Sequence, residues 1–194
     1  MAVADSNPVI LVFGDSLSAA YGIPREQGWV ALLQQQLDQQ PAKRRVINAS
    51  ISGETTSGGL TRLKLLLQQH HPEMVIIQLG ANDGLRGLPV NDMRRNLAAM
   101  IELSQQAGAR VAIIGILIPP NYGPRYTQEF KESYQLLAKQ YKLPLVPFLL
   151  DGVTERPELM QDDGLHPKAN AQAIILDNVW KVLAPHFKAV TANK

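Results

Sequence analysis

Residues 9–16 read VILVFGDS, and this stretch decides how the rest of the chain is interpreted. The unbroken apolar run at residues 9–13 predicts a strand that is buried on both faces, as in a parallel sheet. The run breaks off into Gly14-Asp15-Ser16, and residues of this kind add nothing to a core. They suit a sharp backbone turn that leaves one hydroxyl exposed. Whether Ser16 carries that hydroxyl depends on partners further along the chain.

Short apolar runs and amphipathic stretches alternate along the rest of the chain. Further strands are predicted at residues 45–48, 74–79, 110–116 and 145–147. Between the strands, apolar residues recur at spacings of three and four, which indicates helices. Five successive strand–helix units predict an α/β fold, a three-layer α/β/α sandwich with a five-stranded parallel sheet. No repeat or linker interrupts residues 1–194, so we expect a single domain.

The composition argues against several classes of protein. A net charge of +2 is too small to indicate binding to nucleic acid or to an anionic membrane surface. The chain has no cysteine, which excludes disulfides, thiolate metal sites and a cysteine nucleophile. No apolar run reaches the ~18 residues expected of a membrane span, so we expect no stable insertion into a membrane.

The segment before the first strand, residues 1–8, is expected to be a flexible N-terminus or a remnant of processing. Ala2-Val3-Ala4, followed by Asp5, resembles what remains beside a small-residue cleavage site. That interpretation predicts a periplasmic or secreted protein. A cytoplasmic location is the alternative, and the absence of cysteine fits either compartment.

The residues that follow the predicted strands carry the chemistry, because ligands of open parallel sheets bind beyond the carboxyl ends of the strands. Ser16, Gly53 and Asn82 follow the first three strands, and Asp163 and His166 precede the last helix. Each segment alone is also explained as a turn or a helix cap. Together they supply the complementary parts of one site for nucleophilic acyl transfer.

Each of these residues has a predicted role in that chemistry. Ser16 is the expected nucleophile and His166 the base that takes its proton, while Asp163 orients the imidazole. The backbone N–H groups of Ser16 and Gly53 and the side-chain amide of Asn82 are the expected donors to the oxyanion.

Four blocks of sequence, in order, resemble those of the SGNH (GDSL) hydrolases: GDSL at 14–17, Gly53, GAND at 80–83 and DGLHP at 163–167. Ser16, Gly53, Asn82 and His166 match the four residues that name that family. SGETT at 52–56 and NYG at 121–123 resemble one subgroup, the bacterial multifunctional thioesterases, proteases and lysophospholipases with related arylesterases. The resemblance implies the flavodoxin-like fold of the SGNH hydrolases. It also implies a serine hydrolase of carboxyl esters and thioesters that uses neither a metal nor another cofactor.

Other residues are expected to shape the surroundings of Ser16. Asp15 is predicted to support the turn through hydrogen bonds to backbone amides. The predicted substrate-binding residues are Leu17, Leu85, Leu88, Pro120 and Tyr122. For Leu88 a leucine tucked inward from a surface loop, and for Tyr122 a packed residue with a bonded hydroxyl, are alternatives. We expect a monomer that acts on small acyl esters or thioesters.

Two other functions remain open at this point. A carbohydrate O-acetyl esterase would use the same residues at the edge of the sheet, although leucines near the site favour lipid-like acyl chains. A non-catalytic binding module on the same fold would be favoured by loss of Ser16, Asn82 or His166, and all three are present.

Overall fold

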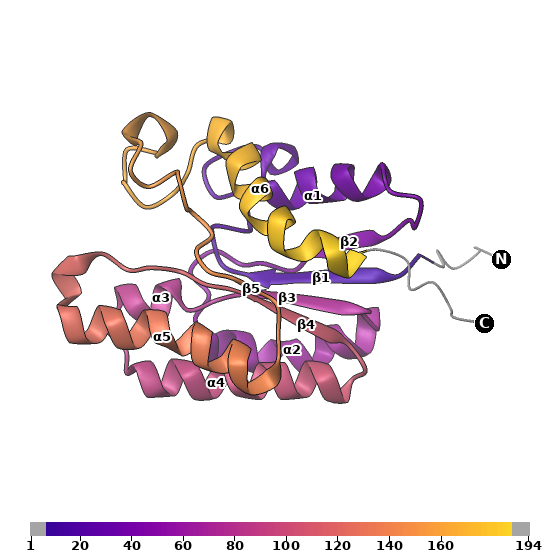
Figure 1. Cartoon of the computed structure of the whole chain (residues 1–194), viewed down its shortest axis with the longest axis horizontal. Coiled ribbons are helices and arrows are strands. Elements are labelled where there is room, and N and C mark those ends of the chain that lie inside the picture. Colours follow the sequence, from indigo (N-terminus) through magenta and orange to yellow (C-terminus); the bar gives the residue numbers. More distant parts are fainter. Residues whose placement is uncertain (1–6, 188–194) are drawn as a thin grey trace.

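The protein is described by a computed structural model that covers residues 7–187 (Figure 1). Its sheet contains five parallel strands in the order β2-β1-β3-β4-β5. The strands are β1 (Val9–Gly14), β2 (Arg45–Asn48), β3 (Met74–Gln78), β4 (Arg110–Ile114) and β5 (Leu145–Val146). This strand order is that of flavodoxin-like sheets. The predicted fold class is therefore confirmed.

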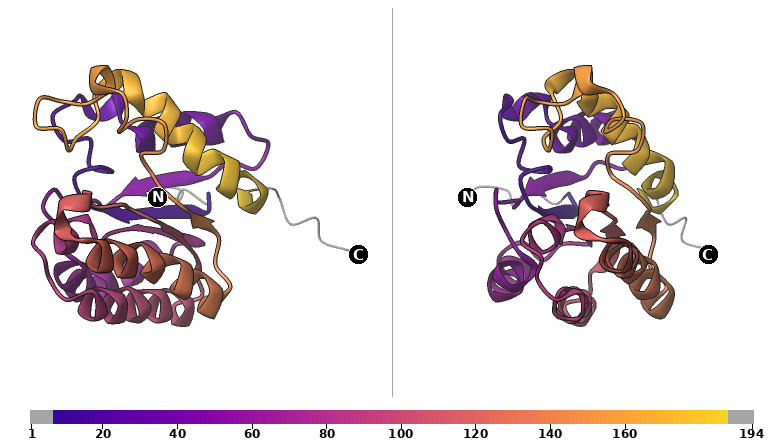
Figure 2. Two further views of the ribbon diagram at one scale, coloured as in Figure 1. Left: turned by 60° about the vertical axis from the view of Figure 1, so that its left-hand side comes forward. Right: turned by 90° about the vertical axis from the view of Figure 1, so that its left-hand side faces the viewer.

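Helices cover both faces of the sheet (Figures 1 and 2). One layer holds α1 (Trp29–Asp38) and α6 (Gln172–Leu183), and the other holds α2 (Thr56–His70), α4 (Val90–Gln106) and α5 (Pro124–Tyr141). The short helix α3 (Ala81–Leu85) follows β3 directly. The connecting segments contain the 3-10 turns η1 (Arg25–Gln27), η2 (Pro120–Tyr122), η3 (Pro157–Leu159), η4 (Ala169–Ala171) and η5 (Ala184–Phe187).

Burial in the sheet follows the position of each strand. Every residue of β1 and of β3 is buried, as the apolar runs at 9–13 and 74–77 predicted, and the polar Gln78 at the end of β3 is buried with them. Strand β2 lies at the edge of the sheet and is half-buried at Val46 and Ile47. The predicted ranges 74–79, 110–116 and 145–147 extend past the ends of the strands at Gln78, Ile114 and Val146. A Cβ atom at Gly115 would lie 2.4 Å from the carbonyl oxygen of Pro147, so only glycine allows the segments after β4 and β5 to approach so closely.

Helix α3 was not predicted, and it places Asn82 and Asp83 in its first turn. The chain enters this helix through Gly80, which has a φ of 122°. A Cβ atom there would lie 2.3 Å from the hydroxyl oxygen of Tyr134, which itself donates a hydrogen bond to the carbonyl of Leu79 (3.0 Å). A glycine is therefore required where β3 turns towards the site.

The N-terminal segment is described only in part. Residues 1–6, on which the processing interpretation depends, lie outside the described residues. The carbonyl of Pro8 accepts a hydrogen bond from the Arg45 N–H (3.0 Å), so residue 8 is already joined to β2. Across residues 7–187, no helix combines the length and the apolar character that a membrane crossing requires.

Candidate active site

Ser16 lies in a tight turn at the carboxyl end of β1. The carbonyl of Asp15 accepts hydrogen bonds from the N–H groups of Ser18 (3.2 Å) and Ala19 (2.9 Å), which bends the chain as in the first turn of a helix. The side chain of Asp15 accepts a further bond from the Leu17 N–H (3.0 Å). Asp15 thus supports the turn in the way that the sequence predicted.

A chain of buried polar groups lies beneath this turn. The hydroxyl of Ser18 donates to Gln78 Oε1 (2.6 Å), and Gln78 Nε2 donates to Asp15 Oδ1 (3.1 Å). Asp15 Oδ2 is buried and has no hydrogen-bond partner among residues 7–187. Burial raises the pKa of Asp15 to about 6, although the hydrogen bonds from Leu17 and Gln78 act in the opposite direction.

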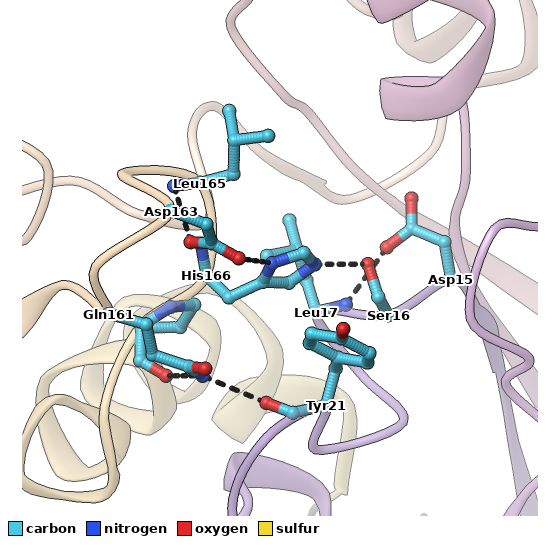
Figure 3. A network of polar contacts seen from close by, with 9 residues as sticks. Asp15, Ser16, Leu17, Tyr21, Gln161, Asp163, Leu165 and His166 are labelled. Atoms are coloured by element: carbon cyan, nitrogen blue, oxygen red, sulfur yellow. Dashed lines mark hydrogen bonds and ion pairs between the residues drawn. The ribbon is translucent and has the colours of Figure 1, made fainter.

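The hydroxyl, imidazole and carboxylate that the sequence singled out lie in one line (Figure 3). His166 Nε2 is 2.8 Å from Ser16 Oγ, and His166 Nδ1 is 2.6 Å from Asp163 Oδ2. The other carboxylate oxygen of Asp163 accepts bonds from the N–H groups of Leu165 (2.9 Å) and His166 (3.0 Å). One loop between η3 and η4 therefore holds the carboxylate and the imidazole together.

The charge of Asp163 determines which nitrogen of His166 carries the proton. Partial desolvation raises the pKa of Asp163, but hydrogen bonds from the His166 ring and from two backbone N–H groups lower it to about 2. The carboxylate is therefore ionised at neutral pH and accepts a hydrogen bond from Nδ1–H, so the proton stays on Nδ1. This leaves Nε2 as an acceptor that faces the hydroxyl of Ser16.

The three predicted oxyanion donors border the same cavity as Ser16 and His166. Within residues 7–187, the N–H groups of Ser16 and Gly53 donate to no protein acceptor. Gly53 has a φ of 79°, a conformation that suits glycine. Asn82 Nδ2 donates one hydrogen bond to the carbonyl of Glu54 (3.0 Å), and its second hydrogen remains for a ligand.

Two pairs of side chains hold the loops that carry Gly53 and Asn82. Asp83 accepts hydrogen bonds from both the hydroxyl (2.6 Å) and the N–H (2.9 Å) of Thr56, so it joins α3 to the start of α2. Arg62 lies 4.3 Å above the ring of Phe13 and donates to Glu54 Oε2 (2.6 Å). Glu54 and Asp83 lie within the SGETT and GAND blocks of the sequence, but nothing in the local sequence indicates their roles or that of Arg62.

A cavity of about 530 Å³ lies beside Ser16. Most of its wall is apolar and comes from the segments after β4 and β5, including Ile116, Ile118, Pro119, Phe148 and Met160. Thr154 and Glu155 add polar groups to this wall. The arrangement sets a nucleophilic hydroxyl next to a pocket that fits a hydrocarbon group.

Three of the five predicted substrate-binding residues, Leu17, Leu85 and Pro120, line this cavity, whereas Leu88 and Tyr122 do not. The hydroxyl of Tyr122 donates to the carbonyl of Leu85 (2.7 Å), so Tyr122 supports the wall from outside. Leu88 is partly exposed. Its backbone is held by Asp83 and Tyr126.

Metal ligands are not gathered in the part of the chain that the structure describes. In residues 7–187, no group of three or more His, Cys, Asp or Glu side chains could hold a metal ion. The groups that are present can transfer a proton, attack a carbonyl carbon and stabilise an oxyanion.

This fold and this site define a serine hydrolase of the SGNH type. The sequence pattern of the GDSL-like lipase/acylhydrolase family matches residues 12–174, and the chain belongs to that family. It is 50% identical to the esterase TesA of Pseudomonas aeruginosa over 91% of this chain and 88% of the relative. It is 43% identical to the thioesterase 1/protease 1/lysophospholipase L1 of Escherichia coli K12, over 91% of this chain and 83% of that protein.

Solved structures show the same similarity. The crystal structure of TesA matches with a TM-score of 0.89, covering 91% of this chain and 98% of the solved chain at 50% identity. The esterase EstA from Pseudoalteromonas sp., solved with monoethylphosphonate as inhibitor, matches with a TM-score of 0.88. It is 46% identical, and the match covers 93% of this chain and 98% of EstA.

Proposed function

We propose that this protein hydrolyses carboxylic esters and thioesters with apolar acyl groups through an acyl-enzyme at Ser16. The observation that carries this proposal is the line of contacts from Asp163 through His166 to Ser16 Oγ. The names of the relatives support it, since they are an esterase and a combined thioesterase, protease and lysophospholipase.

In the acylation step, Ser16 Oγ attacks the carbonyl carbon of the substrate while His166 Nε2 takes the hydroxyl proton. The carbonyl oxygen becomes an oxyanion that accepts hydrogen bonds from the N–H groups of Ser16 and Gly53 and from the amide of Asn82. The tetrahedral intermediate then breaks its bond to the alcohol or thiol. The protonated His166 gives its proton to this leaving group.

In the deacylation step, water replaces the leaving group. His166 Nε2 takes a proton from the water, whose oxygen attacks the acyl carbon bound to Ser16. The bond from this carbon to Ser16 Oγ then breaks, His166 returns the proton to Oγ, and the carboxylic acid is released. Asp163 stays ionised throughout and stabilises the imidazolium in both steps. The apolar wall favours a hydrocarbon acyl chain over the acetyl group of a carbohydrate ester.

The decisive experiment compares Ser16→Ala with wild-type protein on p-nitrophenyl esters and acyl-CoA thioesters of graded chain length. We expect Ser16→Ala to lose about 10³-fold or more of kcat, because the remaining donors cannot replace the nucleophile. Ser57→Ala, an exposed serine of α2, is the control and should match wild type. Unchanged turnover by Ser16→Ala would refute the assigned nucleophile.

A phosphonate reagent gives a second and independent measurement. A fluorophosphonate should add one phosphonyl group to Ser16, which peptide mass spectrometry locates. Ser16→Ala should remain unlabelled at every residue under the same conditions. Labelling of another residue at the wild-type rate would contradict the proposal.

A further inference from the structure

The loop that carries His166 must hold an imidazole against a hydroxyl that lies 150 residues away in the sequence. The base of this loop is closed by an antiparallel bridge between Met160 and Pro167. Inside it, the N–H of Gln161 donates to the carbonyl of His166 (2.7 Å). These contacts give the loop its shape. Its placement relative to Ser16 needs contacts with the segment after β1.

The carboxamide of Gln161 supplies such a contact (Figure 3). Its Nε2 donates to the carbonyl of Tyr21 (2.9 Å) and to the carbonyl of Pro167 (3.0 Å). Tyr21 belongs to the turn of the nucleophile, because its own N–H donates to the carbonyl of Ser16 (3.2 Å). A single amide group therefore joins the segment that carries the nucleophile to the loop that carries the base.

The residue after Tyr21 is shaped around this amide. Gly22 has a φ of 73°, and a Cβ atom there would lie 2.2 Å from Gln161 Oε1. Any other residue at this position would displace the carboxamide and would also strain the backbone. The glycine thus leaves the space that Gln161 occupies.

The ring of Tyr21 acts on His166 directly. The two ring centroids are 4.5 Å apart with an angle of 40° between the planes, and Figure 3 shows the phenol ring beside the imidazole. Tyr21 is 51% exposed, so the ring is held at the surface by its neighbours and not by the core. It limits rotation of the imidazole away from Ser16, and an aromatic ring near an imidazolium also attracts its charge.

We propose that Gln161 and Tyr21 are positioning residues for His166, and we call the pair the Gln161–Tyr21 clamp. This inference rests on the function proposed above. Gln161 holds the two segments in register through its amide, and the Tyr21 ring keeps the imidazole over the hydroxyl of Ser16. A loop with so much exposed surface would otherwise allow His166 to move out of contact.

The first test is Gln161→Ala, with Gln128→Ala as the matched control on the exposed surface of α5. We expect kcat for p-nitrophenyl butyrate to fall by about 10-fold to 10²-fold in Gln161→Ala, because a small misplacement of a reacting group is costly. KM should stay within about twofold of wild type, as the acyl wall is intact. The rate of phosphonyl labelling of Ser16 should fall by the same factor as kcat.

The second test separates the ring from the amide. Tyr21→Ala keeps the backbone carbonyl that Gln161 binds but removes the ring, and we expect a loss of kcat similar to that of Gln161→Ala. Tyr21→Phe keeps the ring and should lose far less than Tyr21→Ala. The double variant Gln161→Ala/Tyr21→Ala should show a smaller fold-loss of kcat than the product of the two single fold-losses, because both residues position the His166 imidazole.

A spectroscopic signature completes the test. The proton between His166 Nδ1 and Asp163 should give a downfield NMR signal, which we expect to broaden in Gln161→Ala as the loop becomes mobile. The clamp would be overturned if Gln161→Ala kept kcat within twofold of wild type, or if only its KM changed. The proposed function would still stand in that case if Ser16→Ala were inactive. An active Ser16→Ala protein would refute that function and the purpose of the clamp with it.

Discussion

Asp15 is a carboxyl group that the fold buries completely beside the nucleophile. Its Oδ1 accepts hydrogen bonds from the Leu17 N–H and from Gln78, but Oδ2 has no partner in the part of the chain that the structure describes. A buried carboxylate with one unsatisfied oxygen is costly, because the charge loses its hydration. The protein accepts this cost at the position where the turn of Ser16 needs an acceptor.

The raised pKa of Asp15 predicts how stability depends on pH. Its pKa is about 6 in the folded protein against 3.8 in the unfolded chain, so the folded state binds more protons between these values. Below about pH 4 the group adds no penalty. As pH rises to about 6 the penalty grows towards about 3 kcal/mol.

The variant Asp15→Asn isolates this effect, since an amide does not ionise. Urea unfolding of wild type and Asp15→Asn between pH 4 and pH 7 should show that the free energy of unfolding falls more steeply with pH in wild type. The difference between the two proteins is the contribution of Asp15. Equal slopes would mean that Asp15 has an ordinary pKa.

Asn82 is the predicted oxyanion donor whose side chain can be removed by mutation. We expect Asn82→Ala to lower kcat by about 10²-fold to 10³-fold with little change in KM, because this donor acts mainly on the transition state. Asn91→Ala, on the exposed surface of α4, is the control for the same substitution. A change in KM alone would show that Asn82 binds substrate and does not stabilise the oxyanion.

Helix α2 holds the loop that precedes it. Arg62 reaches back from α2 to Glu54, whose carbonyl accepts the bond from Asn82. The Glu54 side chain has space for this contact because Gly58 has no Cβ atom; a Cβ atom there would lie 2.2 Å from Glu54 Oε1. The helix therefore helps to fix the distance between Gly53 and Asn82, the two predicted oxyanion donors outside the turn of Ser16.

This arrangement predicts a kinetic effect of Arg62, which lies outside the cavity. Arg62→Met should lower kcat by about fivefold to tenfold, an effect of about 1 kcal/mol, since one hydrogen bond to a charged group is lost. Glu54→Gln should have a similar effect, and the double variant should be no worse than Arg62→Met alone. Lys64→Met, at an exposed position of the same helix, should behave as wild type. Additive losses in the double variant would contradict the pairing.

Strand β2 lies at the edge of the sheet, where free backbone groups can pair with another chain. Gln34 of α1 covers two of these groups: Nε2 donates to the carbonyl of Arg44 (3.0 Å), and Oε1 accepts from the N–H of Val46 (2.6 Å). A side-chain amide thus takes the place of a neighbouring strand. We infer that Gln34 protects the edge from self-association.

The prediction for this edge concerns assembly. Gln34→Ala should self-associate at concentrations where wild type and the exposed control Gln35→Ala remain unchanged in sedimentation velocity. It should also lose about 1–2 kcal/mol of stability, as two hydrogen bonds between the Gln34 side chain and backbone groups are lost. A Gln34→Ala protein that sediments as wild type would show that the edge is protected in another way.

The whole molecule shows which features a sequence can predict. The strand at 9–14 and the turn after it were predictable because burial and turn chemistry are local properties. The blocks around Asn82 and His166 were predictable because parallel strands bring their carboxyl ends to one edge. Helix α3 was missed because a helix of little more than one turn has no measurable periodicity.

Contacts between distant side chains lie beyond such reasoning. The bond from Gln161 to Tyr21 joins residues 140 positions apart, and only the packing of two loops places them together. The direction of a side chain in an irregular segment cannot be predicted from sequence either, because loop residues follow no fixed period. For this reason Leu88 and Tyr122 were expected to line the cavity, although neither does.

The two ends of the parallel strands serve different purposes. The site lies at their carboxyl ends, whereas charged residues gather at their amino ends. There Arg44, which is 7% exposed, donates to Glu73 and to the carbonyl of Phe187 (2.7 Å). Arg110 joins the same cluster through Glu73 and the carbonyl of His186 (2.8 Å). These bonds attach the C-terminal turn η5 to the ends of three strands.

This division predicts that stability and catalysis can be changed separately. Arg44→Met should lower the free energy of unfolding by about 3 kcal/mol, because the carbonyl of Phe187 loses its donor and the partly buried Glu73 keeps only its longer contact with Arg110 (3.6 Å). Its kcat below the melting transition should stay within about twofold of wild type, since no group of the site moves. Arg45→Met, one residue further along and exposed, should change neither quantity. If kcat of Arg44→Met fell in proportion to its loss of unfolding free energy, the two ends of the strands would be coupled. The sheet could then not be treated as a rigid support for the site.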